Sequence, residues 1–195
     1  MSGRVERRAT ARRGFTFAEL LVACALVGIL AAFAVPRLDQ LRVRGDAAAH
    51  QVRGTLQLAQ RLAVQHQWDV SVGFDLPNRR MLVVEDRNNN GQVDQADRER
   101  TRWVPLDDGV RFAAPPSAVP GGVGGAPLVL ARTRLVAGLP AVTFHRGGSA
   151  STTVEVYVAA ERGTRRDLRA VTVVQATGRT ARFRLLDGSW READL

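Results

Sequence analysis

The stretch RGFTFAELLVACALVGILAAFAV, residues 13–35, decides how this chain is organised. Its apolar part runs for 21 residues, from Phe15 to Val35, and carries one charged side chain, Glu19. As an α-helix, this part would be about 31 Å long, close to the hydrocarbon thickness of a bilayer. The sequence therefore predicts a transmembrane helix over residues 15–35.

Charge on either side of this run predicts its orientation. Residues 1–14 hold five arginines and one glutamate, whereas the region after the run is patterned as strands. Basic flanks stay in the cytoplasm, so the N-terminus is expected inside and the rest outside. Two ordinary interpretations compete. A secretory signal peptide would have a shorter apolar region and a better small-residue cleavage site than AAFAVPRL. A plain membrane anchor leaves Glu19 unexplained, because a carboxylate in hydrocarbon needs a partner.

Residues 13–20, RGFTFAEL, resemble the prepilin peptidase site of type IV pilins and type II secretion pseudopilins. The resemblance implies cleavage between Gly14 and Phe15, and methylation of the new amine of Phe15. It also implies that Glu19 pairs with the N-terminal amine of a neighbouring subunit during assembly. Pro36 falls where many members of this family carry a helix-kinking proline.

Partners and location follow from the same resemblance. The implied partners are prepilin peptidase, other pilins or pseudopilins, and the assembly platform of the bacterial inner membrane. The protein would be a single-pass inner-membrane protein with its head in the periplasm, assembled into a pseudopilus or pilus.

Beyond Pro36, apolar residues at helical spacing predict an amphipathic continuation over residues 36–66. From residue 67 the pattern changes to short alternating runs that are typical of strands. The expected fold is α+β: a cleaved leader (1–14), a transmembrane helix (15–35), its continuation (36–66) and an antiparallel β-rich head (67–195).

The head is expected to contain eight strands and one long loop. Residues 113–127 hold four prolines and four glycines, which predicts a mobile loop. The last two strands are expected to form a hairpin through Thr177-Gly178-Arg179. The predicted strands are Val70–Phe74, Met81–Val84, Arg102–Val104, Val110–Phe112, Val142–His145, Thr153–Ala159, Leu168–Ala176 and Thr180–Leu186.

The C-terminal half carries a second, looser resemblance. The run VTFHRGG at residues 142–148, then a strand, then Val171–Val174 and Gly178-Arg179 resemble the head of the GspH and FimT group of minor pilins. The resemblance implies a minor pseudopilin, a structural subunit of a type II secretion pseudopilus. The alternative is a FimT-like minor type IV pilin that binds DNA during uptake.

The DNA alternative depends on seven arginines near the C-terminus. Two of them, Arg182 and Arg184, would share one face of a strand because side chains two apart point the same way. Contacts from such residues to phosphates give affinity without sequence specificity. Few aromatic residues lie nearby to stack on single-stranded bases, so a solvated basic face is the competing interpretation. The seven are Arg162, Arg165, Arg166, Arg169, Arg179, Arg182 and Arg184.

Residues 86–97, DRNNNGQVDQAD, have the spacing of a calcium loop. Oxygen-bearing side chains fall at alternate positions before Gly91, and calcium needs six or more oxygen ligands. Two features depart from the pattern: the last position is Asp rather than a bidentate Glu, and the flanks are predicted strands. The competing interpretation is an Asn/Asp/Gly turn that bonds its own backbone. The candidate ligands are Asp86, Asn88, Asn90, Gln92, Asp94 and Asp97.

Composition argues against several other classes of protein. The single cysteine, Cys24, lies within the apolar run, so no disulfide scaffold or cysteine-ligated zinc site is expected. The three histidines, His50, His66 and His145, are isolated in the sequence, and enzymatic activity is not expected. The net charge is +9, and all 28 basic residues are arginine, of which five lie in the predicted leader.

Overall fold

The structure is a computed structural model that describes residues 16–93, 99–114, 126–127, 133–163 and 167–193, with the side chains of residues 30–42 left out. The chain divides into two compact units, residues 1–39 and residues 40–195. One helix, α1 (Phe17–His66), contributes to both units. Within the described residues, no helix combines the length and the apolarity that crossing a membrane requires.

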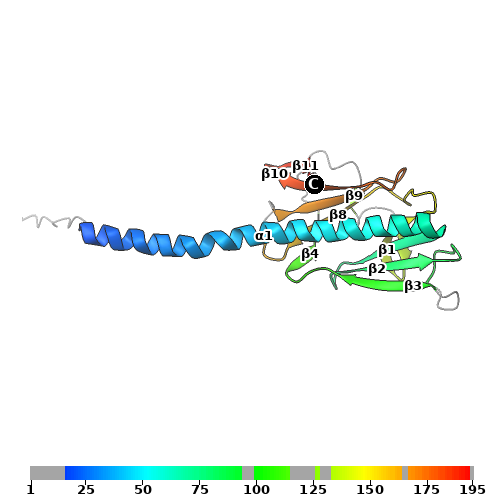
Figure 1. The fold of residues 1–195 in the computed structure, drawn as a ribbon, viewed down its shortest axis with the longest axis horizontal. Coiled ribbons are helices and arrows are strands. Elements are labelled where there is room, and N and C mark those ends of the chain that lie inside the picture. Colours follow the sequence, from blue (N-terminus) through cyan, green and yellow to red (C-terminus); the bar gives the residue numbers. More distant parts are fainter. Residues whose placement is uncertain (1–15, 94–98, 115–125, 128–132, 164–166, 194–195) are drawn as a thin grey trace, which may run out of the picture. The chain divides into compact units, whose positions relative to one another are not determined.

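The second unit, called the head here, contains two β-sheets (Figure 1). Their order is β3-β2-β1-β7-β6 in sheet A and β11-β10-β9-β8-β4 in sheet B. Sheet A consists of β1 (Asp69–Asp75), β2 (Arg80–Asp86), β3 (Arg100–Pro105), β6 (Arg134–Val136) and β7 (Leu139–Phe144). Sheet B consists of β4 (Val110–Phe112), β8 (Val154–Ala160), β9 (Arg169–Val173), β10 (Thr180–Leu186) and β11 (Ser189–Glu192), with the short β5 (Ala126–Pro127) paired to β8.

The core of the head forms where α1 packs on both sheets. Small and branched side chains of α1, among them Val52 and Leu56, are fully buried in one cluster with Val72 of β1 and Val156 of β8. They recur every three or four residues, which places them on one face of the helix. The predicted amphipathic continuation over residues 36–66 lies within α1, and the described residues confirm an α+β fold with antiparallel sheets.

The predicted strands are confirmed, with corrections at their ends. The strand expected to reach His145 ends at Phe144, because the His145 N–H donates to the Ser149 carbonyl in a turn. The strand expected over Leu168–Ala176 is limited to β9. Beyond it, the Val174 N–H donates to the Arg179 carbonyl at 3.0 Å and closes the predicted hairpin to β10.

Three short strands were not predicted. One is β5 (Ala126–Pro127), which lies inside the predicted loop and pairs in parallel with the outer edge of β8. The other two, β6 and β11, each adjoin a two-residue turn in which both residues have positive φ. The turn Ala137-Gly138 follows β6, and the turn Asp187-Gly188 precedes β11. Asp187-Gly188 joins β10 to β11. This dipeptide is a strong hairpin signal, but β11 is polar and lacks the apolar alternation from which the other strands were predicted. The rest of the predicted loop, residues 115–125, lies outside the described residues.

Candidate functional site

The N-terminal end of α1 is built by a reciprocal pair of hydrogen bonds. The Glu19 N–H donates to Thr16 Oγ1 at 3.2 Å, while the Thr16 N–H donates to Glu19 Oε2 at 3.3 Å. This T-x-x-E arrangement is a capping box, which satisfies backbone donors that have no partner in the first helical turn. Glu19 therefore starts the helix, a role that the predicted assembly function did not include. Gly14 and Phe15 lie outside the described residues.

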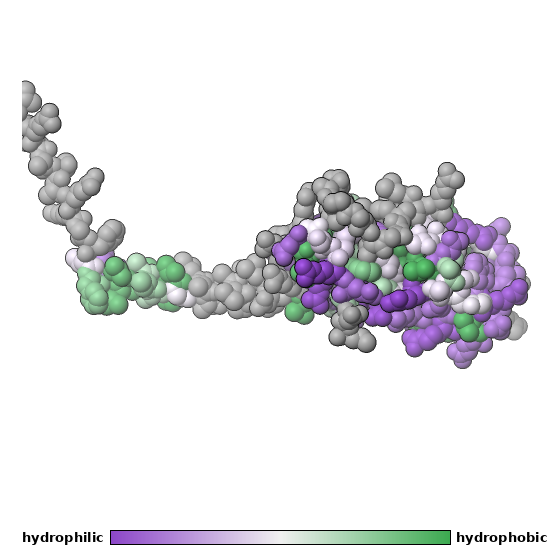
Figure 2. Space-filling model, turned by 90° about the horizontal axis from the view of Figure 1, so that it is seen from above, coloured by the Kyte–Doolittle hydropathy of each residue, from purple (hydrophilic) through white to green (hydrophobic). Residues whose placement is uncertain are grey.

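The helix that follows is apolar on every side. Its described side chains are exposed, among them Phe17 at 78%, Leu21 at 54% and Val27 at 65%. Figure 2 shows the resulting apolar surface, and Glu19 is the one ionisable carboxylate along residues 16–29. A helix that is hydrophobic all round needs an apolar environment, supplied by lipid or by other helices.

The family comparison decides the nature of this segment. Residues 10–35 match the model of the prokaryotic N-terminal methylation motif. The chain carries a prokaryotic N-terminal methylation motif. The match spans the Gly14–Phe15 junction, Glu19 and the apolar helix, and it confirms the predicted type IV pilin-like N-terminus.

Comparisons of the whole chain are less informative. Two structures of the minor pseudopilin EpsH from the type II secretion system of Vibrio cholerae are similar to it. One has 15% identity and a TM-score of 0.45, covering 76% of this chain and 94% of EpsH. The other has 16% identity and a TM-score of 0.47, covering 78% and 97%. Similarity at this level does not establish a shared fold. No curated protein matches the chain.

In the head of this methylation-motif protein, the residues of the second resemblance meet at one junction. Gln60 of α1 donates from Nε2 to the carbonyls of Gly148 and Thr177, at 2.7 Å and 2.9 Å. Gly178 has φ +64°, and a Cβ there would lie 2.1 Å from the Gly148 carbonyl oxygen. Only glycine fits this approach. The turns that contain Gly148 and Gly178 therefore hold the C-terminal part of α1 against both sheets through Gln60.

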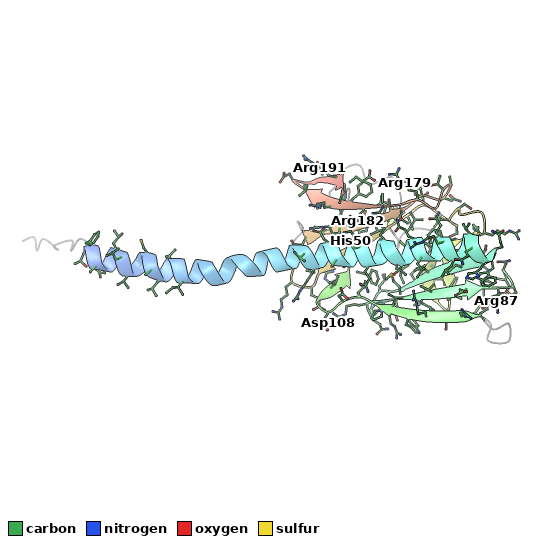
Figure 3. The ribbon with its side chains drawn as sticks, viewed as in Figure 1. His50, Arg87, Asp108, Arg179, Arg182 and Arg191 are labelled. Carbon is green, nitrogen blue, oxygen red and sulfur yellow. The ribbon has the colours of Figure 1, made fainter. Side chains whose placement is uncertain are left out.

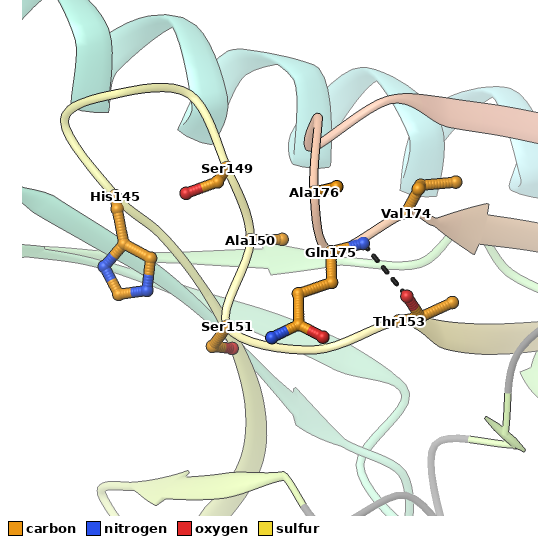
Figure 4. A pocket seen from close by; sticks show the side chains of 8 residues that line it. All are labelled: His145, Ser149, Ala150, Ser151, Thr153, Val174, Gln175 and Ala176. Carbon is orange, nitrogen blue, oxygen red and sulfur yellow. Dashed lines mark hydrogen bonds between the residues drawn. The ribbon is translucent and has the colours of Figure 1, made fainter.

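Beside this junction is a pocket of about 580 Å³ (Figure 4). His145 lines it together with Ser149 and Ser151, and its Nδ1 lies 2.9 Å from Asp69 Oδ2. A serine nucleophile would need a hydrogen bond to the imidazole. Among the described residues, no hydrogen bond joins either serine hydroxyl to the His145 imidazole; the bond from the His145 N–H to Ser149 is to the backbone carbonyl. Ser151 Oγ instead accepts the Thr143 N–H at 3.1 Å.

The described part of the predicted calcium loop is organised by its own backbone. Asp86 is buried, and its carboxylate accepts the N–H groups of Asn90 and Gly91 at 3.1 Å and 2.5 Å. Asn88 Oδ1 accepts the Asn90 N–H, and Asn90 Oδ1 accepts the Gln92 N–H. The described residues contain no group of three or more His, Cys, Asp or Glu side chains that could hold a metal ion. Asp94 and Asp97 lie outside them, so calcium binding stays a prediction.

The described C-terminal arginines do not share one exposed face. Arg169 and Arg182 are both 5% exposed, and Arg169 makes a two-pronged ion pair with Asp46 of α1, at 2.6 Å and 3.4 Å. Arg179 is exposed and pairs with Glu192. Arg162 is exposed in the turn after β8, while Arg165 and Arg166 lie outside the described residues. Arg182 and Arg184 do share a strand face, but that face carries Arg169 and is turned toward α1.

Sequence reasoning missed the helix residues that meet this strand face. His50 and Arg53 of α1 interact electrostatically with Arg182 of β10. Figure 3 labels His50 and Arg182 where α1 and β10 face each other. Burial, followed by the charge of Arg182, lowers the pKa of His50 below its ordinary value. Asp46, His50, Arg53 and Gln60 follow one another at helical spacing, which is the signal that could have placed them on one face.

Proposed function

We propose that this protein is a minor pseudopilin, a structural subunit of a type II secretion pseudopilus that assembles through its N-terminal helix. The observation that carries the proposal is the N-terminal methylation motif over residues 10–35. Within it, the described apolar side chains, over residues 17–29, are exposed and need burial, while a single carboxylate, Glu19, is available for a cation.

The physical argument for assembly concerns this carboxylate. Prepilin peptidase cleavage between Gly14 and Phe15 would leave an α-amine four residues before Glu19. In an apolar environment an unpaired carboxylate is costly, whereas one that meets the amine of a neighbouring subunit is compensated. The pair would form only when two subunits dock in one register. The helix would hold the subunit in the inner membrane, with the head in the periplasm, until the assembly platform adds it to the filament.

The FimT-like alternative, a minor type IV pilin that binds DNA, has weaker support. Its candidate residues Arg169 and Arg182 are buried, and Arg179 is paired. Phosphate contacts use arginines that project from the surface. The secretion subunit is therefore the preferred function, while the GspH and FimT resemblance is common to both alternatives and does not choose between them.

Mass spectrometry of the protein from native membranes tests the first step. The expected mature N-terminus is Phe15 with one added methyl group. An intact Met1, or a mature start after Ala34, would contradict the proposal, because either result removes prepilin processing.

Two substitutions at Glu19 separate its two roles. Glu19→Gln keeps a side chain that completes a capping box but removes the charge, whereas Glu19→Ala removes both. If the charge pairs with a neighbouring amine, both variants should insert into the membrane yet crosslink poorly to other pilins. Restoration of crosslinking by Glu19→Gln would show that only the helix start matters.

A further inference from the structure

Several buried polar atoms without hydrogen-bond partners lie where α1 meets β10 in the head. Among the described side chains, Arg53 Nε, Thr180 Oγ1, Arg182 Nε and Arg184 Nε are buried and unpartnered. Thr180, Arg182 and Arg184 lie on one face of β10, and Arg53 lies on the stripe of α1 that interacts with Arg182. Arg53, Arg182 and Arg184 are called the arginine cluster here. Buried donors that lack partners are rare in native proteins and point to a missing ligand.

The arginine cluster carries an excess of positive charge. Arg53, Arg182 and Arg184 are accompanied by Arg169, while Asp46 is the nearby carboxylate that acts on Arg182. Asp46 is already engaged by Arg169 through two hydrogen bonds. Burial and the neighbouring charge of Arg53 lower the pKa of Arg182 below its ordinary value. A buried cation beside two like charges is stabilised by an anion that accepts hydrogen bonds.

We propose that the arginine cluster binds an acidic side chain of a neighbouring protein subunit. The planar guanidinium fork suits a carboxylate, and Thr180 Oγ1 supplies a further donor. Arg182 is 5% exposed whereas Arg53 and Arg184 are half-buried, so the cluster is reached through these two side chains. A carboxylate on a thin side chain can approach partly buried guanidinium groups, whereas the phosphates of a wide, rigid duplex contact projecting side chains.

This site is separate from the N-terminal assembly segment. That the partner is a filament subunit rests on the proposed function, but carboxylate binding by the cluster does not. A binding measurement on isolated protein therefore fails or succeeds independently of prepilin processing.

The experiment uses the full chain in neutral detergent micelles, and the probe is a labelled hexaglutamate peptide with blocked ends. Fluorescence anisotropy at physiological ionic strength should detect binding, and a hexaglutamine peptide should not bind. Arg53→Gln and Arg184→Gln should each weaken binding by at least about tenfold, because each removes a charge-assisted hydrogen bond. The matched control is Arg102→Gln on exposed β3, which removes the same charge from sheet A and should change affinity by about twofold or less.

A second variant protects the test against loss of folding. Arg182→Met replaces a buried cation by an apolar side chain of similar length. It should abolish peptide binding and raise the melting temperature of the free protein, because the uncompensated charge is gone. An arginine that only supports the fold would lower the melting temperature instead.

Four results would overturn the proposal. These are absence of peptide binding, equal losses in Arg53→Gln and Arg102→Gln, and stronger cluster-dependent binding by duplex DNA than by the peptide. The fourth result concerns the chain's own Asp194. Arg182 Nη2 donates a hydrogen bond to the carbonyl of the preceding residue, Ala193, at 3.4 Å. If Asp194→Asn lowers the melting temperature and strengthens peptide binding, the chain's own carboxylate occupies the cluster.

Discussion

At the scale of single residues, the pair between Asp46 and Arg169 connects α1 to β9. The Arg169 side chain is 5% exposed and the Asp46 side chain 33% exposed, so the cation depends on this carboxylate more than the reverse. A buried guanidinium loses hydration that only a close acceptor replaces. The position of this part of α1 on sheet B therefore depends on a charge pair as well as on apolar packing.

Asp46→Ala should lower the free energy of unfolding by about 2 kcal/mol. This is less than the full cost of leaving a buried charge alone, because Asp46 is partly hydrated in the native protein. Urea unfolding of the full chain in detergent measures it. The matched control is Glu161→Ala, which removes the exposed partner of Arg79 and should change stability by about 0.5 kcal/mol or less. Equal losses of unfolding free energy in the two variants would show that the Asp46–Arg169 pair contributes no more to stability than an exposed ion pair.

Asp75 predicts a dependence of stability on pH. Hydrogen bonds from Arg80, then from Asn78, lower the pKa of its carboxyl below the ordinary value of 3.8. The unfolded chain therefore binds the proton at a higher pH than the folded chain does. The stabilisation is complete above pH 3.8 and is lost as the pH falls from there through the folded-state pKa.

Asp75→Asn should therefore flatten the fall in melting temperature below about pH 4, while at neutral pH it should be less stable than the natural protein. Thermal scans across pH 2–7 compare the two. Parallel curves for both proteins would contradict the role given to this carboxyl.

At the scale of elements, α1 has two different surfaces. In the head its apolar face supplies Val52 and Leu56 to the core, while its polar stripe from Asp46 to Gln60 meets the strands and turns of sheet B. Residues 16–29 lack such a division and are exposed and apolar. This difference within one helix separates a packing function in the head from the assembly function proposed for the N-terminal part.

The loop after β2 remains a calcium candidate that can be tested without disturbing its described hydrogen bonds. If residues 86–97 bind calcium, millimolar calcium should raise the melting temperature by about 2–4 °C for each 1 kcal/mol of binding free energy. Asp94→Asn should abolish this shift, because it removes a candidate carboxylate ligand. Asp108→Asn, an exposed acid before β4, should leave it unchanged. Identical melting in calcium and in chelator would favour the Asn/Asp/Gly turn.

At the scale of the whole molecule, positive charge is distributed over several surfaces. Arginines are exposed on β3 of sheet A and in the turn after β8 of sheet B, while two of the five described C-terminal arginines, Arg169 and Arg182, are buried. A high net charge alone gives weak, salt-sensitive binding to nucleic acid.

The full chain should therefore bind duplex DNA only at low salt. Arg179→Gln and Arg102→Gln should reduce this binding equally, because each removes one exposed charge. Affinity measured as a function of salt concentration provides the comparison. Binding near physiological salt, with a salt slope that falls when Arg182 and Arg184 are both replaced by Gln, would restore the DNA-uptake alternative.

The sequence by itself determined those features that depend on local order. The methylation motif, the capping residues and the apolar run are contiguous, and side-chain periodicity distinguished α1 from the main strands. The Asp187-Gly188 hairpin was also readable from two adjacent residues, although strand patterning alone missed it.

Only the tertiary structure decided how distant polar residues meet. Burial of Arg182, its approach to Arg53 and the pairing of Asp46 with Arg169 join residues more than 120 positions apart. Seven arginines close together in sequence were the candidates for one basic surface, yet strand pairing turned Arg169, Arg182 and Arg184 toward α1. Charge density along a chain does not specify which face of a strand a helix will cover. The physical reason is that side-chain burial depends on which elements pack together, and the apolar cores of both sheets determine that packing.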